Sequence, residues 1–171
     1  MLHGKRVVVI EDDSDVRVAT ALLLGAMNAS VFVFPSAVDF IEHDGSVRAD
    51  IILLDMILPG ISGLDALNAL RCKFPSVPVL IVSGSGDSVC RGYQDGIGFL
   101  EKPYPAAKLA AEIISLTLRG TGRSVAKTAM VKCEQFHRET YSSSKLPETR
   151  GKVAMSRIPR RYNLPKDATS E

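Results

Sequence analysis

Short apolar runs that end in polar or turn-forming residues recur along the first 120 residues of the chain. They predict strands over about 5–10, 31–34, 51–54, 77–82 and 97–100. The third run, Ile51 to Leu54, is apolar at every position, which is typical of a strand buried on both faces of a parallel sheet. It ends at the carboxylate Asp55, and Pro59 and Gly60 follow as turn residues.

Apolar residues at helical spacing separate the predicted strands. Ser14 or Asp15 can cap a first helix, whose apolar positions are Val16, Ala19, Leu22, Leu23 and Ala26. Ser36 and Ser62 each precede an aspartate by three residues, a capping-box spacing that begins two further helices. The helix after Ser62 carries a stripe of Leu64, Leu67 and Leu70. A weak helix is expected up to about Gln94, and a last helix, ending near Arg119, carries Leu109, Ile113 and Leu116 on one face.

Strand and helix therefore alternate five times within about 120 residues. This alternation predicts an α/β domain with a doubly wound, five-stranded parallel sheet and helices on both of its faces. Five such units are too few for an eight-stranded barrel.

The periodic pattern stops after Gly120. Residues 1–120 hold 10 Lys and Arg against 14 Asp and Glu, a balance of −4, whereas residues 121–171 hold 11 against 5, a balance of +6. We expect residues 121–171 to form a basic, largely irregular and flexible extension, with at most a short helix over about 125–136. Its scattered apolar residues offer no second core, so no recognisable effector domain is expected there.

Polar residues follow the carboxyl ends of four predicted strands, the side on which open α/β sheets bind ligands. Glu11 and Asp12 follow the first strand, Asp55 ends the third, Ser83 follows the fourth and Lys102 follows the fifth. If the strands take the order 2-1-3-4-5, the first and third are neighbours, and the three carboxylates share one pocket.

Three neighbouring carboxylates repel one another unless a cation neutralises them, and Mg²⁺ suits a site with few carboxylates and several waters. Asp55 beside such a metal is placed to act as an oxygen nucleophile and form an aspartyl phosphate. Lys102 supplies an ammonium that can meet the incoming negative charge, and the Ser83 hydroxyl can donate to a phosphate oxygen.

Each of these residues also has a structural interpretation. The acids at 11–13 could be a solvated helix start, Ser83 a loop residue and Lys102 a surface lysine before a turn. Their joint placement at one sheet edge, in this chain order, favours the functional interpretation.

On these residues the chain resembles the receiver domain of two-component response regulators. The matching segments span about residues 4–118 and comprise Val8-Val9-Ile10-Glu11-Asp12-Asp13, Leu54-Asp55-Met56 with Leu58-Pro59-Gly60 and Gly63, Ser83-Gly84, and Glu101-Lys102-Pro103. The resemblance implies a flavodoxin-like sheet in the order 2-1-3-4-5 over residues 1–120.

The resemblance also implies roles for these residues. Asp55 would accept a phosphoryl group from a phosphohistidine on a sensor histidine kinase or phosphotransfer protein, and Lys102 would pair with it. Mg²⁺ would be held by Asp12, Asp55, the backbone carbonyl of Ile57 and, through water, Glu11. Such a protein catalyses its own phosphorylation and dephosphorylation but is not an enzyme acting on an outside substrate.

In this family a hydroxyl at the position of Ser83 moves toward the phosphate, and an aromatic at the position of Phe99 changes rotamer. Phe99 has no hydroxyl, so it can switch by packing alone, or it is simply a core residue. The signalling surface would comprise the fourth helix, the fifth strand and the last helix, and it would include Tyr104 and the helix from Ala106 onward. Its partner would be an unknown downstream protein, and a homodimer is possible.

Apolar run lengths, cysteines and the basic extension indicate the compartment and the competing functions. No apolar run approaches the ~20 residues that span a bilayer, and the apolar run Val7 to Ile10 is too short for that of a signal peptide. An odd number of cysteines without metal-ligand spacing suits reduced thiols. We therefore expect a cytoplasmic protein without a membrane partner. A nucleic-acid-binding regulator that uses the basic extension is the less favoured alternative. A metal-dependent phosphohydrolase is disfavoured, because such enzymes often place a second aspartate two residues after the nucleophile, where this chain has Ile57.

Overall fold

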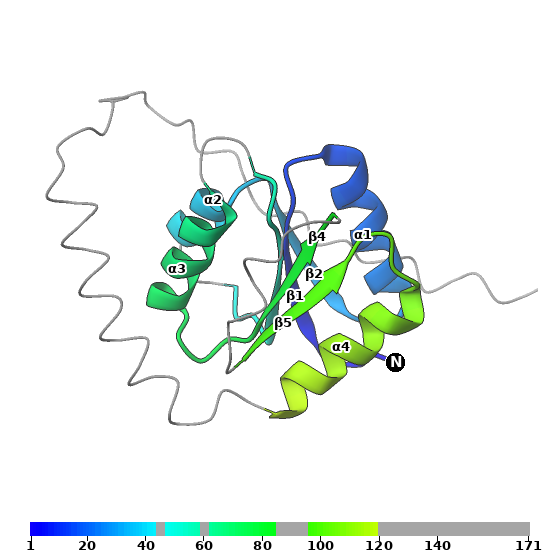
Figure 1. Ribbon diagram of the computed structural model, residues 1–171. Coiled ribbons are helices and arrows are strands. Elements are labelled where there is room, and N and C mark those ends of the chain that lie inside the picture. Colours follow the sequence, from blue (N-terminus) through cyan, green and yellow to red (C-terminus); the bar gives the residue numbers. More distant parts are fainter. Residues whose placement is uncertain (44–46, 59–61, 85–95, 120–171) are drawn as a thin grey trace, which may run out of the picture.

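Five parallel strands form the central layer of the protein, whose computed structural model describes residues 1–43, 47–58, 62–84 and 96–119 (Figure 1). The strands are β1 (Arg6–Ile10), β2 (Ser30–Phe34), β3 (Ile51–Asp55), β4 (Val79–Ser83) and β5 (Ile97–Glu101). Their spatial order is β2-β1-β3-β4-β5. The sequence predicted all five strands, and the order implied by the resemblance is confirmed.

Helices cover both faces of this sheet. They are α1 (Ser14–Ala26), α2 (Ala37–Glu42), α3 (Gly63–Lys73) and α4 (Ala106–Arg119). Figure 1 shows α1 and α4 on one side of the sheet and α2 and α3 on the other. The helix predicted up to Gln94 and the one over 125–136 lie outside the described residues, as does the whole extension after residue 119.

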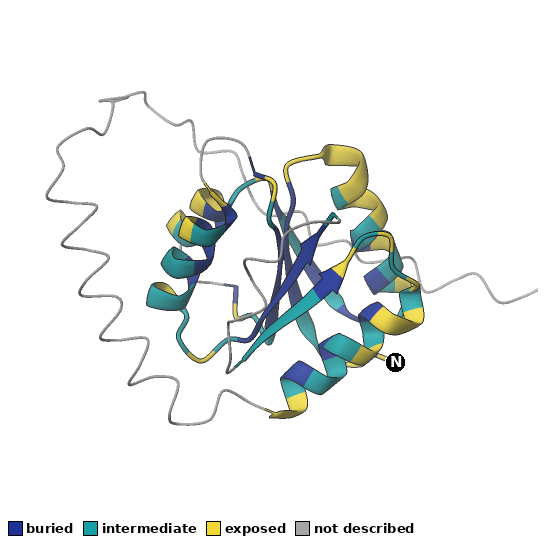
Figure 2. Ribbon diagram, in the orientation of Figure 1, coloured by how far each residue is buried: buried dark blue, intermediate teal, exposed yellow. Residues whose placement is uncertain are grey.

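Alternation along each strand divides the core between the two faces, because successive side chains of a strand point in opposite directions. Val7 and Val9 of β1 pack with α1 and α4, whereas Val8 and Ile10 pack with α2 and α3. Every residue of β3 and β4 is buried, so the sheet interior is apolar on both sides (Figure 2). Polar side chains of these strands are therefore confined to the carboxyl ends, Asp55 and Ser83.

Helix starts were predicted well for α2 and α3 but not for α1. The hydroxyls of Ser36 and Ser62 accept hydrogen bonds from backbone amides three residues later, at 3.1 Å in both cases, as the capping-box spacing predicted. The first helix begins at Ser14, and its cap is Asp13, not Ser14 or Asp15. The Asp13 carboxylate reaches two amides of the first turn, which makes it the better acceptor among adjacent candidates.

The predicted apolar stripe of α1 is also wrong. Ala21 and Leu24 are fully buried, whereas Val16 and Leu22 are 37% and 45% exposed. Apolar residues occur nearly all round this helix, so their spacing could not identify the buried face. The stripes of the other long helices were assigned better: Leu67 and Leu70 of α3, and all three residues named for α4, are buried.

No helix in the described ranges is long and apolar enough to cross a membrane. Cys72 of α3 is disulfide-bonded, so the expectation of a reduced thiol is wrong for this residue. That expectation used only the number and spacing of cysteines, which do not report which thiols meet in the fold.

An ion pair between Arg6 and Asp50 joins the starts of β1 and β3 at the amino edge of the sheet. Arg6 donates to Asp50 Oδ1 through Nη2 (2.7 Å) and to Oδ2 through Nε (3.1 Å) and its backbone N–H (2.8 Å). The backbone N–H of Asp50 donates to the Arg6 carbonyl at 2.8 Å. These contacts fix the register of the two strands that later deliver Glu11 and Asp55.

The Asp50→Asn variant is expected to lower the free energy of unfolding by about 1–2 kcal/mol at pH 7. Arg6 holds the pKa of Asp50 below its ordinary value. A depressed folded pKa means that this contribution is complete above the unfolded pKa of about 4 and is lost as pH falls through the folded pKa. Urea unfolding of wild type and variant at pH 7 and at pH 2.5 should therefore show a difference in stability that is smaller in acid. Glu42→Gln, at an exposed acid of α2, is the control and should change stability by less than ~0.5 kcal/mol.

Candidate functional site

Strand register brings the predicted site residues together at the carboxyl edge of the sheet. Ile10 pairs with Leu54, so the next residues along the two strands, Glu11 and Asp55, lie side by side. Asp55 pairs with Val82, and Ser83 pairs with Glu101, the residue before Lys102. The Lys102 N–H donates to the Ser83 carbonyl at 2.7 Å, which extends this pairing by one residue.

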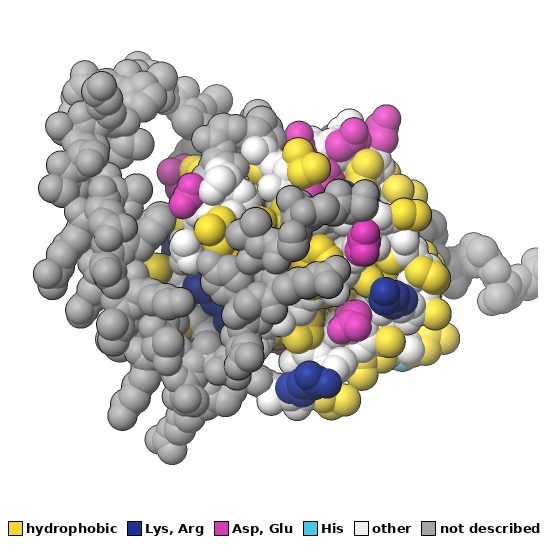
Figure 3. Space-filling model, viewed as in Figure 1, with side chains coloured by type: hydrophobic (Ala, Val, Ile, Leu, Met, Phe, Trp, Pro, Cys, Tyr) yellow, Lys and Arg dark blue, Asp and Glu magenta, His cyan; other side chains and the backbone are white. Residues whose placement is uncertain are grey.

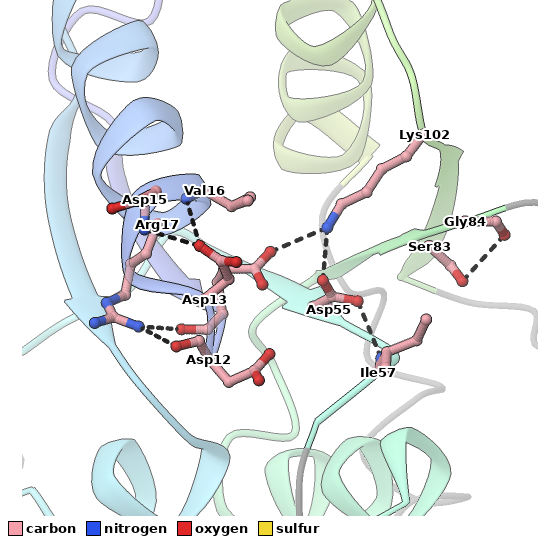
Figure 4. A network of polar contacts seen from close by, with 11 residues as sticks. Asp12, Asp13, Asp15, Val16, Arg17, Asp55, Ile57, Ser83, Gly84 and Lys102 are labelled. Carbon is pink, nitrogen blue, oxygen red and sulfur yellow. Dashed lines mark hydrogen bonds and ion pairs between the residues drawn. The ribbon is translucent and has the colours of Figure 1, made fainter.

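Lys102 joins two carboxylates from different strands. Its Nζ donates to Asp55 Oδ2 at 2.6 Å and to Glu11 Oε2 at 3.0 Å (Figure 4). The other oxygen of Asp55, Oδ1, accepts the backbone N–H of Ile57 at 3.0 Å. The Asp55 carboxylate is thus oriented from both sides before any ligand arrives.

The two carboxylates differ in proton affinity although both are buried, with only 6% of Glu11 and 7% of Asp55 exposed. Burial and the hydrogen bond with Asp55 raise the pKa of Glu11 from 4.5 to about 6, against the opposing effect of Lys102. Burial also raises the pKa of Asp55, but the Ile57 N–H and Lys102 outweigh it, so this pKa lies below its ordinary value. Glu11 therefore takes up a proton at a higher pH than Asp55 does.

The connection between β1 and α1 carries the other predicted metal ligand. Asp12 is exposed, and Figure 4 shows its side chain on the same side of the sheet edge as Asp55 and Ile57. Its neighbour Asp13 is committed to capping α1 through the amides of Asp15 and Val16. Of the three acids at 11–13, Glu11 and Asp12 remain to face Asp55.

The donor set fits Mg²⁺, which binds proteins through one or two carboxylates and keeps several waters. Asp12 and Asp55 supply two carboxylates, and the Ile57 backbone lies beside Asp55. Within the described residues no three His, Cys, Asp or Glu side chains are grouped as a preformed metal cage. Lys102 lies between Glu11 and Asp55, so a cation would share these carboxylates with an ammonium already present.

Comparison with known proteins agrees with this arrangement. The model of the response regulator receiver domain family matches residues 7–114. The chain belongs to this family. It is 34% identical over 122 residues to the transcriptional regulatory protein CseB of Streptomyces coelicolor, covering 70% of this chain and 52% of that protein. The chain thus spans about half the length of this curated relative.

Solved receiver structures share the fold. A response regulator receiver domain protein from Clostridium thermocellum superposes with a TM-score of 0.59 at 27% identity, over 67% of this chain and 95% of that one. The receiver domain of a sensor histidine kinase from Pseudomonas aeruginosa, crystallised with a magnesium ion in its active site cleft, superposes with a TM-score of 0.56 at 19% identity. That comparison covers 67% of this chain and 98% of the other.

The two proposed switch residues of this receiver lie on neighbouring strands. Ser83 is fully buried, and its hydroxyl donates to the Gly84 carbonyl at 3.3 Å (Figure 4). Phe99 is half-buried against the α2 and α3 side of the core, in register with Ile81. Its incomplete burial is compatible with either a movable ring or a plain packing residue, so the switch role stays a prediction.

Two residues support the site from α1 and from the loop after Lys102: Thr20, which sequence reasoning missed, and Tyr104, which it placed on the signalling surface. Thr20, Tyr104, Glu11 and Asp55 line a small cavity beneath the carboxylates. Tyr104 packs against the core formed with α1 and α4, and burial raises the pKa of its hydroxyl. The Lys102–Pro103 peptide bond ahead of it is cis. No local motif marks Thr20, because its proximity to the site depends on how α1 crosses the sheet.

The raised pKa of Glu11 predicts a stability cost in the receiver without divalent cations. A raised folded pKa means that stability is highest below the unfolded pKa and falls as pH rises through the folded pKa, here between about 4.5 and about 6. The loss should be at most about 2 kcal/mol. Glu11→Gln should remove it and be more stable than wild type at pH 7 in EDTA.

Urea unfolding in EDTA at pH 4.5, 6 and 7.5 measures this difference, with Glu112→Gln on α4 as the control. Equal stability of wild type and Glu11→Gln across this range would contradict the assignment of the proton to Glu11.

Proposed function

We propose that this receiver accepts a phosphoryl group on Asp55, in the cytoplasm, from a phosphohistidine on a sensor histidine kinase or phosphotransfer protein. The observation that carries this proposal is the buried Asp55 carboxylate, with Lys102 Nζ at 2.6 Å and a backbone N–H on its other oxygen. An ionised oxygen held in one orientation is prepared to attack phosphorus in line.

In the transfer step an Asp55 oxygen forms a bond to phosphorus while the phosphorus–nitrogen bond to the donor imidazole breaks, and that nitrogen keeps the electron pair. Negative charge then increases around Asp55. Lys102 can transfer its hydrogen bonds from the free carboxylate to a phosphoryl oxygen, and so stabilises this charge at the point where it develops. Glu11 can hold a proton when Lys102 moves away from it, which limits the repulsion inside the site.

Asp12, Asp55 and the backbone carbonyl of Ile57 would hold Mg²⁺, with Glu11 acting through water. Bound there, the ion would neutralise the carboxylates and the transferred group. The magnesium ion in the Pseudomonas aeruginosa receiver supports this assignment by analogy. The protein promotes its own phosphorylation and dephosphorylation in this way and is not an enzyme acting on an outside substrate.

Phosphorylation would be signalled through the surface formed by β5 and α4. Ser83 moving toward the phosphoryl group and Phe99 repacking would couple Asp55 to this surface. The partner would be an unknown downstream protein or a second copy of this receiver.

A second candidate, binding to nucleic acid, is favoured by the +6 balance of residues 121–171 and by the name of the relative CseB, a transcriptional regulatory protein. It predicts that DNA binding falls steeply with salt and is lost when residues 121–171 are removed. Retention assays of the full chain and the truncated chain at 50 and 200 mM salt measure this, and equal binding by both chains would exclude it.

Lys102→Met should be phosphorylated about 10²–10³-fold more slowly than wild type by acetyl phosphate and Mg²⁺, because the developing charge loses its ammonium partner. Lys102→Arg should also be slow, since a planar guanidinium does not replace a compact ammonium. Phosphorylation is followed by intact mass, with circular dichroism as the check of folding.

Lys108→Met removes a lysine at an exposed position of α4 and is the matched control, with an unchanged rate expected. A folded Lys102→Met that is phosphorylated as fast as wild type would contradict the proposed role.

A further inference from the structure

Arg17 of α1 binds the backbone of the connection that carries Glu11 and Asp12. Its Nη1 donates to the Glu11 carbonyl at 2.6 Å and to the Asp12 carbonyl at 2.9 Å (Figure 4). The residue is half-buried, one turn into a helix whose start is capped by Asp13. One side chain therefore fixes two consecutive peptide groups.

These two peptide groups decide where the acidic side chains point. Only three residues, 11–13, connect the end of β1 with the start of α1. The Glu11 N–H is held by the Phe34 carbonyl at 3.2 Å, and Asp13 is held by its capping bonds. Because each peptide group is planar, fixing the carbonyls of Glu11 and Asp12 sets the rotation of the chain between these two anchors. Arg17 is thus the contact that orients the middle of the connection.

The guanidinium of Arg17 lies in an acidic stretch of the chain. Acidic side chains gather near the amino end of α1 (Figure 3), and the sequence contributes Glu11, Asp12, Asp13 and Asp15 in this stretch. Lys102 pairs with the Glu11 carboxylate, whereas Arg17 binds the carbonyls. Arg17 therefore brings a positive charge to an acidic connection while the Asp12 carboxylate remains exposed and accessible to a ligand.

We propose that Arg17 is a positioning residue for Mg²⁺: it holds the backbone of Glu11 and Asp12 so that their carboxylates converge with Asp55. This inference rests on the proposed function. Removal of Arg17 has two opposing effects. Losing a positive charge near the site should strengthen binding of a divalent cation, whereas losing the two backbone bonds should weaken it. The proposal states that positioning dominates, so the sign of the change tests it.

The test is calorimetric titration of the full-length chain with Mg²⁺ alone, for wild type, Arg17→Met and Arg17→Lys. Arg17→Met keeps a long apolar stem and removes both donors, and it should bind Mg²⁺ about ten-fold more weakly, as loss of groups that orient metal ligands commonly does. Arg17→Lys keeps the charge and one donor group and should lie between the two. Arg48→Met is the matched control, because it removes the same charge from an exposed position ahead of β3, at the opposite edge of the sheet.

A second measurement distinguishes a positioning role of Arg17 from a general loss of structure or activity. With acetyl phosphate as donor, the Mg²⁺ concentration for half-maximal phosphorylation should rise about ten-fold in Arg17→Met, while the rate at saturating Mg²⁺ changes less than about three-fold. Thermal unfolding without Mg²⁺ establishes that each variant is folded. If Arg17→Met does not fold, Mg²⁺ binding by Arg17→Lys is compared with that of wild type instead.

Equal or tighter Mg²⁺ binding by a folded Arg17 variant would overturn the positioning role while leaving the proposed function intact. A wild-type protein that binds no Mg²⁺ would overturn both. Weaker binding by Arg17→Met with normal binding by Arg48→Met would support the role.

Discussion

The ammonium of Lys102, bound to both Asp55 and Glu11, is the interaction on which the rest of the site depends. Two largely buried carboxylates at neighbouring strand ends repel each other, and burial raises the pKa of both. Lys102 and the Ile57 N–H keep Asp55 ionised, while Glu11, which lacks the backbone bond, takes the proton first. The Lys102 ammonium thus keeps the Asp55 carboxylate available as a nucleophile. After transfer it can donate its hydrogen bonds to the phosphoryl group instead.

The sheet positions the strand ends that carry Glu11, Asp55 and Lys102. Its interior is apolar on both faces, so charged side chains are excluded from β3 and β4 until the last residue of each strand is reached. The Arg6–Asp50 pair sets the register of β1 and β3 at one edge, and at the other edge that register puts Glu11 beside Asp55. A slip of one residue would turn Asp55 into a helix-covered face and separate it from Lys102.

Much of this arrangement could be predicted from the sequence because its causes are local. Apolar runs predicted the strands, and serine caps predicted the starts of α2 and α3. Polar residues directly after strands indicated the site. The buried face of α1, its cap at Asp13 and the contact of Arg17 with the backbone were not predicted. They depend on the angle at which α1 crosses the sheet and on which of several adjacent acids reaches the first amides. Cys72 was misjudged for a similar reason, since cysteine spacing carries no information on proximity in space.

The central claim is that Asp55 is the phosphoacceptor, and intact mass spectrometry after incubation with Mg²⁺ and acetyl phosphate tests it most directly. We predict one phosphoryl group per chain, stable in acid and labile in base, on wild type, and none on Asp55→Asn. A folded, Mg²⁺-binding wild type that gains no phosphoryl group, or an Asp55→Asn variant that gains the same one, would contradict it.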